Sequence, residues 1–469
     1  MDEGFAHLQG SKHNKKGMLP PDGGWGYMVC IGVGFTFMFG FGSTNAFGIL
    51  FNQFFMEQGG ASSLALVIGV YNGALSIAGF LSGIALKKYS FRQVGLVGAG
   101  LFVLGDVMTI FVQRTYQLVF TFGVVRGAGF GVMIPVSLTA FNCYFNKKRT
   151  AMMSANQSMS SLASITFPML VTLLLSEYGF RWTLILIMAL DLHLVLAMLV
   201  MHPVEWYLIK GTEADTLCEA LSLKKLSFDQ AAVNMLSDDD SDIEVTDIKE
   251  NKGRRRHESI QKSILKIIYE NVDVDLLKDP RFVSTLVGLG FTFVSDVTYL
   301  AMEPILLFSY GFSEMQVATC VMVGAVADFL ARLGLAIFTY FYTVDSRTIF
   351  FFGTCVTVVL RIALVSTSDL YFVYAITVIS GLVRCTVQVL FPLVLVTAAP
   401  DRFPAALALH ILFSGCLMLM ADPLISVIFV TTGSYVYCFL AMSVSCFISV
   451  VLWTVEYFVY RKNKTRRCQ

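Results

Sequence analysis

Ten acidic or basic residues stand inside long apolar runs of this 469-residue chain. A charged side chain at the centre of a membrane helix costs about 2.5–3.5 kcal/mol, so each is expected to face a partner or a water-filled cavity. The ten are Asp106, Arg126, Asp191, Asp296, Glu303, Asp328, Arg332, Arg361, Arg384 and Asp422.

Asp328 and Arg332 form the pair best suited to chemistry. They are four residues apart, so a helix places them on one face. The planar guanidinium group matches the geometry of a carboxylate, and an aspartate beside it could exchange a proton. The pair therefore has the chemistry to bind a carboxylate or to exchange a proton. The alternative is a purely structural ion pair.

Two further cations are candidates for binding a carboxylate. Arg126 lies within Gly123-x-x-x-Gly127-x-x-x-Gly131, a pattern typical of close helix packing, and Arg384 lies in a later run. Ion pairs with Asp106, Asp296 or Asp422 are the favoured alternative for both. Structural roles are expected for Arg361, Asp191 and His193. For Glu303, before Pro304 at an expected helix break, a gate and a structural role are equally open.

Twelve runs are apolar and long enough, at about 20 residues, to cross a bilayer. They cover 26–51, 62–86, 94–113, 117–142, 151–175, 182–201, 282–309, 315–343, 348–368, 370–397, 404–430 and 435–455. The expected organisation is an N-terminal segment (1–25), a six-helix half (26–202), a central loop (203–280), a second six-helix half (281–456) and a tail (457–469). We expect both termini and the loop to be cytosolic, because the short segments on that side hold 16 Lys and Arg and the outer loops only two.

Composition excludes several classes of protein. Hydrophobic residues make up 56% of the chain and charged residues 14%, against about 25% in soluble domains. A net charge of +1 gives no case for nucleic acid. Ten scattered cysteines and six histidines show no metal-ligand spacing, and no phosphate-binding loop or catalytic triad is recognisable. We expect neither an enzyme nor a cofactor.

Several short blocks resemble the monocarboxylate transporter family of the major facilitator superfamily. They are Pro21-Asp22-Gly23-Gly24-Trp25-Gly26-Tyr27, Tyr144-Phe145-Asn146-Lys147-Lys148-Arg149, Gly179-Phe180-Arg181-Trp182 and Asp401-Arg402-Phe403, together with the Asp328/Arg332 spacing. The resemblance implies an all-α membrane fold of twelve helices in two six-helix halves. Asp22, Gly23, Gly24, Trp25, Tyr144, Phe145 and Arg149 are expected to have structural roles. It also implies that Arg332 binds the substrate carboxylate and that Asp328 takes part in proton coupling.

Three positions depart from the pattern of that family's lactate carriers. Asn45 stands where those carriers have a lysine, and an amide cannot titrate. Val383 and Val387 stand where the family has an aromatic residue and a serine in its pocket. Relatives without the lysine include carriers of aromatic amino acids that work without protons.

The function expected is therefore secondary active or facilitative transport of monocarboxylates or related carboxylate-bearing molecules across the plasma membrane. The alternatives are an aromatic amino-acid-type facilitator without proton coupling and a non-transporting sensor or scaffold. Expected partners are the substrate and membrane lipid; proton coupling and a single-span glycoprotein subunit are left open. The acidic run between Ser237 and Ser241 is read as part of a solvated linker, or alternatively as a phosphorylation or docking segment.

Overall fold

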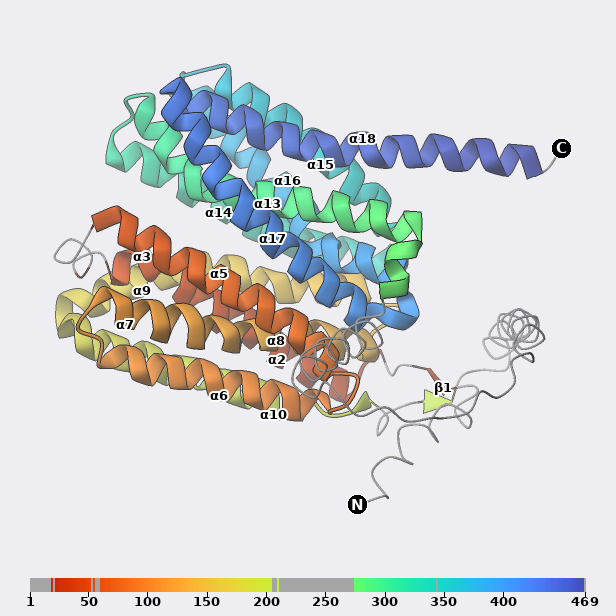
Figure 1. Ribbon diagram of the computed structural model, residues 1–469, viewed down its shortest axis with the longest axis horizontal. Coiled ribbons are helices and arrows are strands. Elements are labelled where there is room, and N and C mark those ends of the chain that lie inside the picture. Colours follow the sequence, from red (N-terminus) through yellow and green to blue (C-terminus); the bar gives the residue numbers. More distant parts are fainter. Residues whose placement is uncertain are drawn as a thin grey trace, which may run out of the picture.

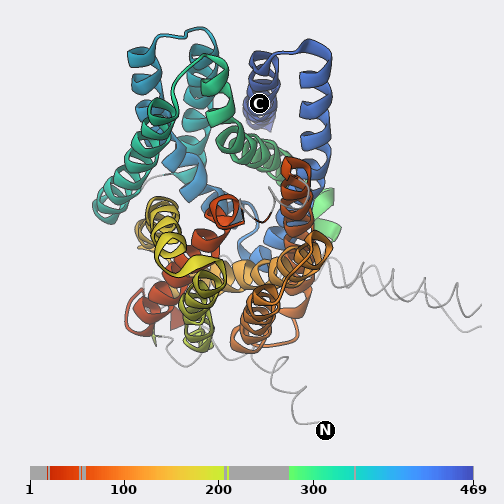
Figure 2. The same ribbon diagram turned by 90° about the vertical axis from the view of Figure 1, so that its left-hand side faces the viewer.

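Long helices lie roughly side by side in the computed structural model of this chain (Figure 1). The structure describes residues 18–19, 22–51, 54, 60–204, 209–210, 274–342 and 345–467. The helices before residue 204 form one bundle and those after residue 274 form the other (Figure 2). We call these bundles the N-half and the C-half.

The helical elements follow the apolar runs closely. The N-half consists of α2 (Trp25–Asn45), α3 (Phe47–Leu50), α5 (Gly60–Ala85), α6 (Phe91–Ile110), α7 (Thr115–Leu118), a π-helical turn η2 (Val119–Arg126), α8 (Gly127–Tyr144), α9 (Arg149–Asp191) and α10 (His193–Leu199). The C-half consists of η4 (Val274–Lys278), α13 (Pro280–Ser309), α14 (Glu314–Phe341), α15 (Ser346–Val365), α16 (Leu370–Ala398), η5 (Pro400–Arg402), α17 (Phe403–Thr432) and α18 (Tyr435–Arg467).

Two differences from the expected elements are small. Two-residue strands β1 (Met18–Leu19) and β2 (Ile209–Lys210) pair antiparallel outside the bundles. Helix α18 continues to Arg467, through much of the expected tail.

Within the described ranges, eleven helical stretches are long and apolar enough to cross a membrane. One of them is long enough to cross it twice, which gives twelve crossings. One stretch, Arg149–Leu199, has 51 residues, or about 77 Å of helix, which is far more than a bilayer core of about 30 Å requires. It bends at Gly179, whose φ of 73° lies in the left-handed region that glycine tolerates. This kink separates the fifth crossing from the sixth.

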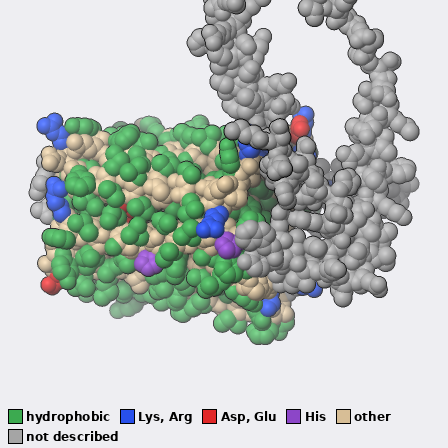
Figure 3. Space-filling model, turned by 90° about the horizontal axis from the view of Figure 1, so that it is seen from below, with side chains coloured by type: hydrophobic (Ala, Val, Ile, Leu, Met, Phe, Trp, Pro, Cys, Tyr) green, Lys and Arg blue, Asp and Glu red, His purple; other side chains and the backbone are tan. Residues whose placement is uncertain are grey.

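The flank of the bundle is apolar, as a lipid-facing surface must be. Large side chains such as Val97, Met169 and Val430 are between 62% and 80% exposed. Hydrophobic side chains cover the flank shown in Figure 3. Exposure on this scale indicates lipid contact, and the chain is therefore a multi-pass membrane protein.

One end of the bundle is rich in lysine and arginine. It carries Lys87, Lys88, Lys147, Lys148 and Arg149, and we call it the basic end. The other end, where α3 meets α5 and where Gly179 lies, is the opposite end. Most of the expected central loop, including Ser237 and Ser241, falls outside the described residues, and so does the side chain of Asp422.

Candidate functional site

Asp328 and Arg332 form a tight ion pair on α14. The Arg332 Nε lies 3.1 and 3.0 Å from the two carboxylate oxygens, and its Nη2 lies 2.9 Å from Asp328 Oδ2. Only 2% of Asp328 and 3% of Arg332 is exposed. Both lie far from the helix ends, about 20 and 14 Å along α14 from Phe341. The pair therefore stands near the middle of the membrane.

Partners of this pair come from α9 in the other half. Arg332 Nη1 donates to the backbone oxygen of Gln157 at 3.0 Å and to its side-chain oxygen at 3.2 Å. Ser161 Oγ donates to Asp328 Oδ2 at 2.6 Å, and Ser154 Oγ donates to the backbone oxygen of Arg332 at 2.6 Å. The Asp328–Arg332 pair is therefore a joint between the two halves.

Sequence reasoning missed these three α9 partners. A signal was available, because Ser154, Gln157 and Ser161 are spaced by three and four residues and so share one helix face. A polar stripe in a membrane helix indicates a helix contact or a cavity wall.

Arg384 on α16 is more exposed than the two other buried arginines of the C-half, Arg332 and Arg361. Its Nε lies 3.1 Å from Asp296 Oδ2 on α13, and its Nη1 lies 3.9 Å from Asp328 Oδ2. Gln388 also donates to Asp296 Oδ2, at 2.5 Å. The Arg384 side chain remains 23% exposed, whereas that of Arg332 is 4% exposed. The pairing with Asp296 that was considered for Arg384 is thus present, and it leaves part of the guanidinium group accessible.

A second buried layer lies behind Arg384. Arg361 lies 3.6 Å from Asp296, donates to Ser295 and stacks over the ring of Tyr299 at 4.7 Å. Tyr299 in turn donates to Glu303 at 3.2 Å. Arg361 is 2% exposed and is held on all these sides, as expected of a structural residue.

The expected helix break beside Glu303 is wrong. Helix α13 continues through Pro304 to Ser309. Proline is tolerated within membrane helices, where neighbouring groups satisfy the freed backbone carbonyl.

The three positions that depart from the family pattern lie in different surroundings. Val387 is buried, and Val383 is half-buried one residue before Arg384 on α16. Asn45 is exposed at the last turn of α2 and donates to Ser164 on α9 at 2.8 Å. Asn45 therefore bonds within the N-half.

Arg126 belongs to a separate cluster inside the N-half. Its Nε lies 2.8 Å from Asp106 on α6, and its Nη2 lies 3.0 Å from Asp191 at the end of α9. The same Nη2 donates to Ser43 on α2 at 2.5 Å. The guanidinium group lies over the rings of Phe102 and Phe122, and the residue is 2% exposed. The expected pairing with Asp106 is present, and Asp191 joins it.

The first two sequence motifs pack against each other at the basic end. Asp22 Oδ1 accepts from the backbone N–H groups of Asn146 (2.7 Å) and Lys148 (3.4 Å), and its Oδ2 accepts from that of Lys147 (3.3 Å). The Asp22 carboxylate thus binds the peptide groups directly before α9, where a negative charge is favourable. Gly24 adopts a φ of 56° in the same turn, beside Gly23.

The aromatic and basic residues of these motifs hold the same end together. Trp25 Nε1 donates to the backbone oxygen of Val200 at 3.1 Å. Arg149 donates from Nε to the backbone oxygen of Phe145 at 2.9 Å. Tyr144 donates to the backbone oxygen of His202 at 3.1 Å. The motifs therefore connect α2, α8, α9 and the segment after α10.

The two halves also approach closely at the basic end. Lys148 Nζ donates to the Tyr340 hydroxyl at 3.3 Å, and this bond raises the pKa of Lys148 above its ordinary value. At a second contact between the halves, a methyl group added at Gly83 of α5 would stand 2.4 Å from the Ala408 methyl group of α17. Only glycine fits at such a distance.

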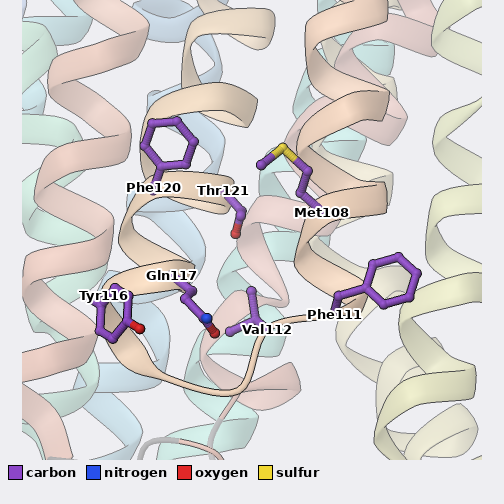
Figure 4. Close-up of a pocket in the computed structure, with 7 residues that line it drawn as sticks. All are labelled: Met108, Phe111, Val112, Tyr116, Gln117, Phe120 and Thr121. Atoms are coloured by element: carbon purple, nitrogen blue, oxygen red, sulfur yellow. The ribbon is translucent and has the colours of Figure 1, made fainter.

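A pocket of about 480 Å³ lies away from this joint. It is lined by the end of α6 and the residues after it, by α7 and by the start of η2, through Met108, Phe111, Val112, Tyr116, Gln117, Phe120 and Thr121 (Figure 4). Phe111, Tyr116 and Phe120 are more than half exposed, which places the pocket on the apolar flank near the opposite end.

Comparison with known proteins agrees with this architecture. The family model described as Major Facilitator Superfamily matches residues 33–341. Monocarboxylate transporter 13 of Rattus norvegicus is 32% identical over 188 residues, which is 39% of this chain and 43% of that protein. The chain thus spans less than half of that relative. Monocarboxylate transporter 1 of Homo sapiens is 26% identical over 448 residues, covering 92% of this chain and 85% of that protein. The resemblance inferred from the motifs is confirmed, and the chain belongs to the major facilitator superfamily.

Proposed function

We propose that this protein carries small monocarboxylates, or related carboxylate-bearing molecules, across the plasma membrane by alternating access, with Arg332 as the anchor for the carboxylate. The observation that carries the proposal is the position of the Asp328–Arg332 pair. It lies near mid-membrane and its hydrogen bonds join the two halves. Carriers of this superfamily bind substrate at that level between their halves.

An exchange of partners at Arg332 would link binding to movement. A substrate carboxylate offers the guanidinium group the same planar pair of oxygens that Asp328 offers now. When the substrate takes that place, Asp328 loses its bonds to Arg332 Nε and Nη2, whereas Nη1 can keep its bonds to Gln157 of α9. Substrate binding thereby changes the charge balance at the contact of α9 with α14.

The orientation follows from the distribution of positive charge. With the basic end in the cytosol, as the positive-inside rule requires, both termini are cytosolic. The Lys148–Tyr340 and Gly83–Ala408 contacts then close the cytosolic side. On this orientation, we infer that the structure is a conformation of the carrier closed toward the cytosol.

Arg384 is proposed as a second cation of the same site. Its partly exposed guanidinium group lies 3.9 Å from Asp328, which places it within reach of a ligand that displaces Asp328 from Arg332. Val383, next to it, would set the shape of the adjoining wall. Arg126, by contrast, is enclosed in the N-half, so we give it no direct contact with substrate.

Uptake into proteoliposomes tests the proposal. A panel of labelled carboxylates, including lactate and aromatic amino acids, is offered with and without an inward proton gradient. Arg332→Ala should abolish uptake at unchanged reconstitution, whereas Arg347→Ala, which removes a pair with Glu456 at the basic end, should retain it. Transport that survives Arg332→Ala would refute the role of Arg332 as the carboxylate anchor.

Proton dependence is expected to be weaker than in lactate carriers, because Asn45 cannot titrate. A steep proton dependence of uptake that Asp328→Asn abolishes would contradict this.

The aromatic amino-acid facilitator remains the second candidate, supported by Asn45 in place of a lysine. Uptake of aromatic amino acids that is insensitive to the proton gradient would favour it. Failure of the whole carboxylate panel, together with a protein that binds the central loop, would favour a sensor or scaffold instead.

A further inference from the structure

The Asp106–Arg126–Asp191 cluster has an excess of negative charge. Two carboxyl groups share one guanidinium group, and Asp191 is 0% and Asp106 9% exposed. Among the charged side chains that the structure describes in the C-half interior, three acidic residues (Asp296, Glu303 and Asp328) balance three arginines (Arg332, Arg361 and Arg384). The N-half cluster therefore carries one uncompensated charge if both of its carboxyl groups are ionised.

Each carboxyl group also has an oxygen without a partner. Asp106 Oδ2 and Asp191 Oδ1 are buried and accept no hydrogen bond in the described part of the chain. The two groups contact the same guanidinium group, Asp106 at Arg126 Nε and Asp191 at its Nη2, and so lie close together. Two ionised carboxylates repel at this distance, whereas a carboxylic acid beside a carboxylate forms a strong hydrogen bond.

No other described group supplies the missing positive charge. Tyr71 faces the cluster from α5, where its hydroxyl lies 3.0 Å from that of Thr44. Ser43 faces it from α2 and receives a hydrogen bond from Arg126. His193 on α10 is two residues from Asp191, but its ring stacks on Phe39 and its Nδ1 lies 2.8 Å from the Leu190 backbone oxygen. Arg126 is thus the only cation that contacts the two acids in the described structure.

We propose that Asp106 and Asp191 together bind one proton, which makes the cluster neutral and is separate from any proton carried at Asp328. With that proton present, one acid donates to the other carboxylate while Arg126 binds both. Without it, repulsion between the carboxylates would push α6 away from the end of α9. The site lies beside the π-helical turn η2, whose last residue is Arg126. Such turns often occur at functional sites.

Infrared spectroscopy of the purified protein in lipid nanodiscs tests proton binding without reference to transport. Protein grown with carbon-13-labelled aspartate should show, at neutral pH, a carboxylic-acid carbonyl band that shifts with the label. Asp106→Asn and Asp191→Asn should each remove that band. Each variant leaves a single carboxyl group beside Arg126, and that group stays ionised because its charge is compensated. Asp328→Asn should leave it in place. Absence of the band from the wild type, or its persistence in both N-half variants, would overturn the proposal.

The pH profile of substrate exchange supplies the second readout and rests on the proposed function. Wild-type exchange should fall at alkaline pH as the bound proton is lost. Asp191→Asn imitates the protonated acid and should keep its activity in that range, while Lys148→Gln should show the wild-type fall. An alkaline fall that is unchanged in Asp191→Asn would overturn the proposal. If Asp191→Asn does not fold, the infrared band of the wild type and of Asp106→Asn still decides the question. If the protein does not transport the substrates offered, the infrared result is unaffected.

Discussion

Replacement of Ser161 by alanine should open the basic end of the carrier. Ser161 Oγ donates to Asp328 Oδ2 at 2.6 Å across the contact of α9 with α14. This bond depends on the two halves being together at this level, so a conformation in which they separate loses it. A buried hydrogen bond to a charged group contributes about 1.5–3 kcal/mol. Its removal should therefore shift the ratio of open to closed molecules about 10- to 150-fold toward the open form.

Ser158→Ala is a matched control on the same helix. Ser158 is also fully buried, but its hydroxyl donates to the Ala155 backbone oxygen within α9 at 2.6 Å. Its removal changes the helix without changing a bond between the halves. The conformational ratio should therefore stay close to that of the wild type.

Electron spin resonance distance measurement provides the assay. Spin labels on non-natural amino acids at positions 88 and 402 report the separation of α5 and α17 at the basic end and leave the native cysteines untouched. The Ser161→Ala distribution should gain a population at longer distance that Ser158→Ala lacks. If the two variants give the same distribution, the bond does not hold the halves together, and the reasoning is refuted.

Three further expectations concern the basic end. Gly83→Val should shift the same distance distribution toward separation, because even a methyl group at this position would stand 2.4 Å from the Ala408 methyl group; an unchanged distribution would contradict this. Asp22→Ala should lower stability by about 0.5–1.5 kcal/mol through loss of the hydrogen bonds from the three N–H groups before α9, measured as a fall in Tm, and Asp22→Asn should cost less because it keeps one acceptor oxygen. The contact of Lys148 with Tyr340 should persist throughout the physiological pH range, because its raised pKa keeps the lysine charged and the stabilisation is lost only as pH rises through that pKa; a change in the distances between pH 6 and about 8 that Lys148→Gln abolishes would show otherwise.

Much of the fold could be predicted from apolar run length alone. The run 282–309 became α13 from Pro280 to Ser309, and the run 370–397 became α16 from Leu370 to Ala398. Lipid contact forces such runs to be helical, since every backbone polar group must be satisfied within the helix. The extension of α18 to Arg467 was missed because hydropathy falls beyond the membrane while the helix continues.

The site was predicted only where its residues are near in sequence. Asp328 and Arg332 could be paired from their spacing because both belong to one helix. The bonds from Gln157 and Ser161 join segments more than 160 residues apart, and no spacing rule relates residues in different helices. Arg384 and Asp296 also lie in different helices, so their ion pair could be predicted only as one of several possible pairings.

The contact between the first two sequence motifs could likewise not be predicted from the sequence. Asp22 and the Asn146–Lys148 segment were each recognised, but their contact arises because α2 begins and α8 ends at the basic end of the bundle. One carboxylate thereby satisfies three peptide N–H groups directly before α9. This explains in physical terms why both motifs occur together in the chain.

Thermal stabilisation by ligand tests the role of Arg332 most directly. Purified protein is heated with the carboxylate that the uptake panel identifies and, separately, with its uncharged amide. A ligand at 100 times its Kd stabilises a protein by about 2.7 kcal/mol. The carboxylate should raise the Tm of the wild type and the amide should not, and Arg332→Lys should lose the shift because it cannot bind both oxygens through a planar fork. An equal shift in Arg332→Lys, or an equal shift with the amide, would contradict the assignment of Arg332 as the carboxylate anchor.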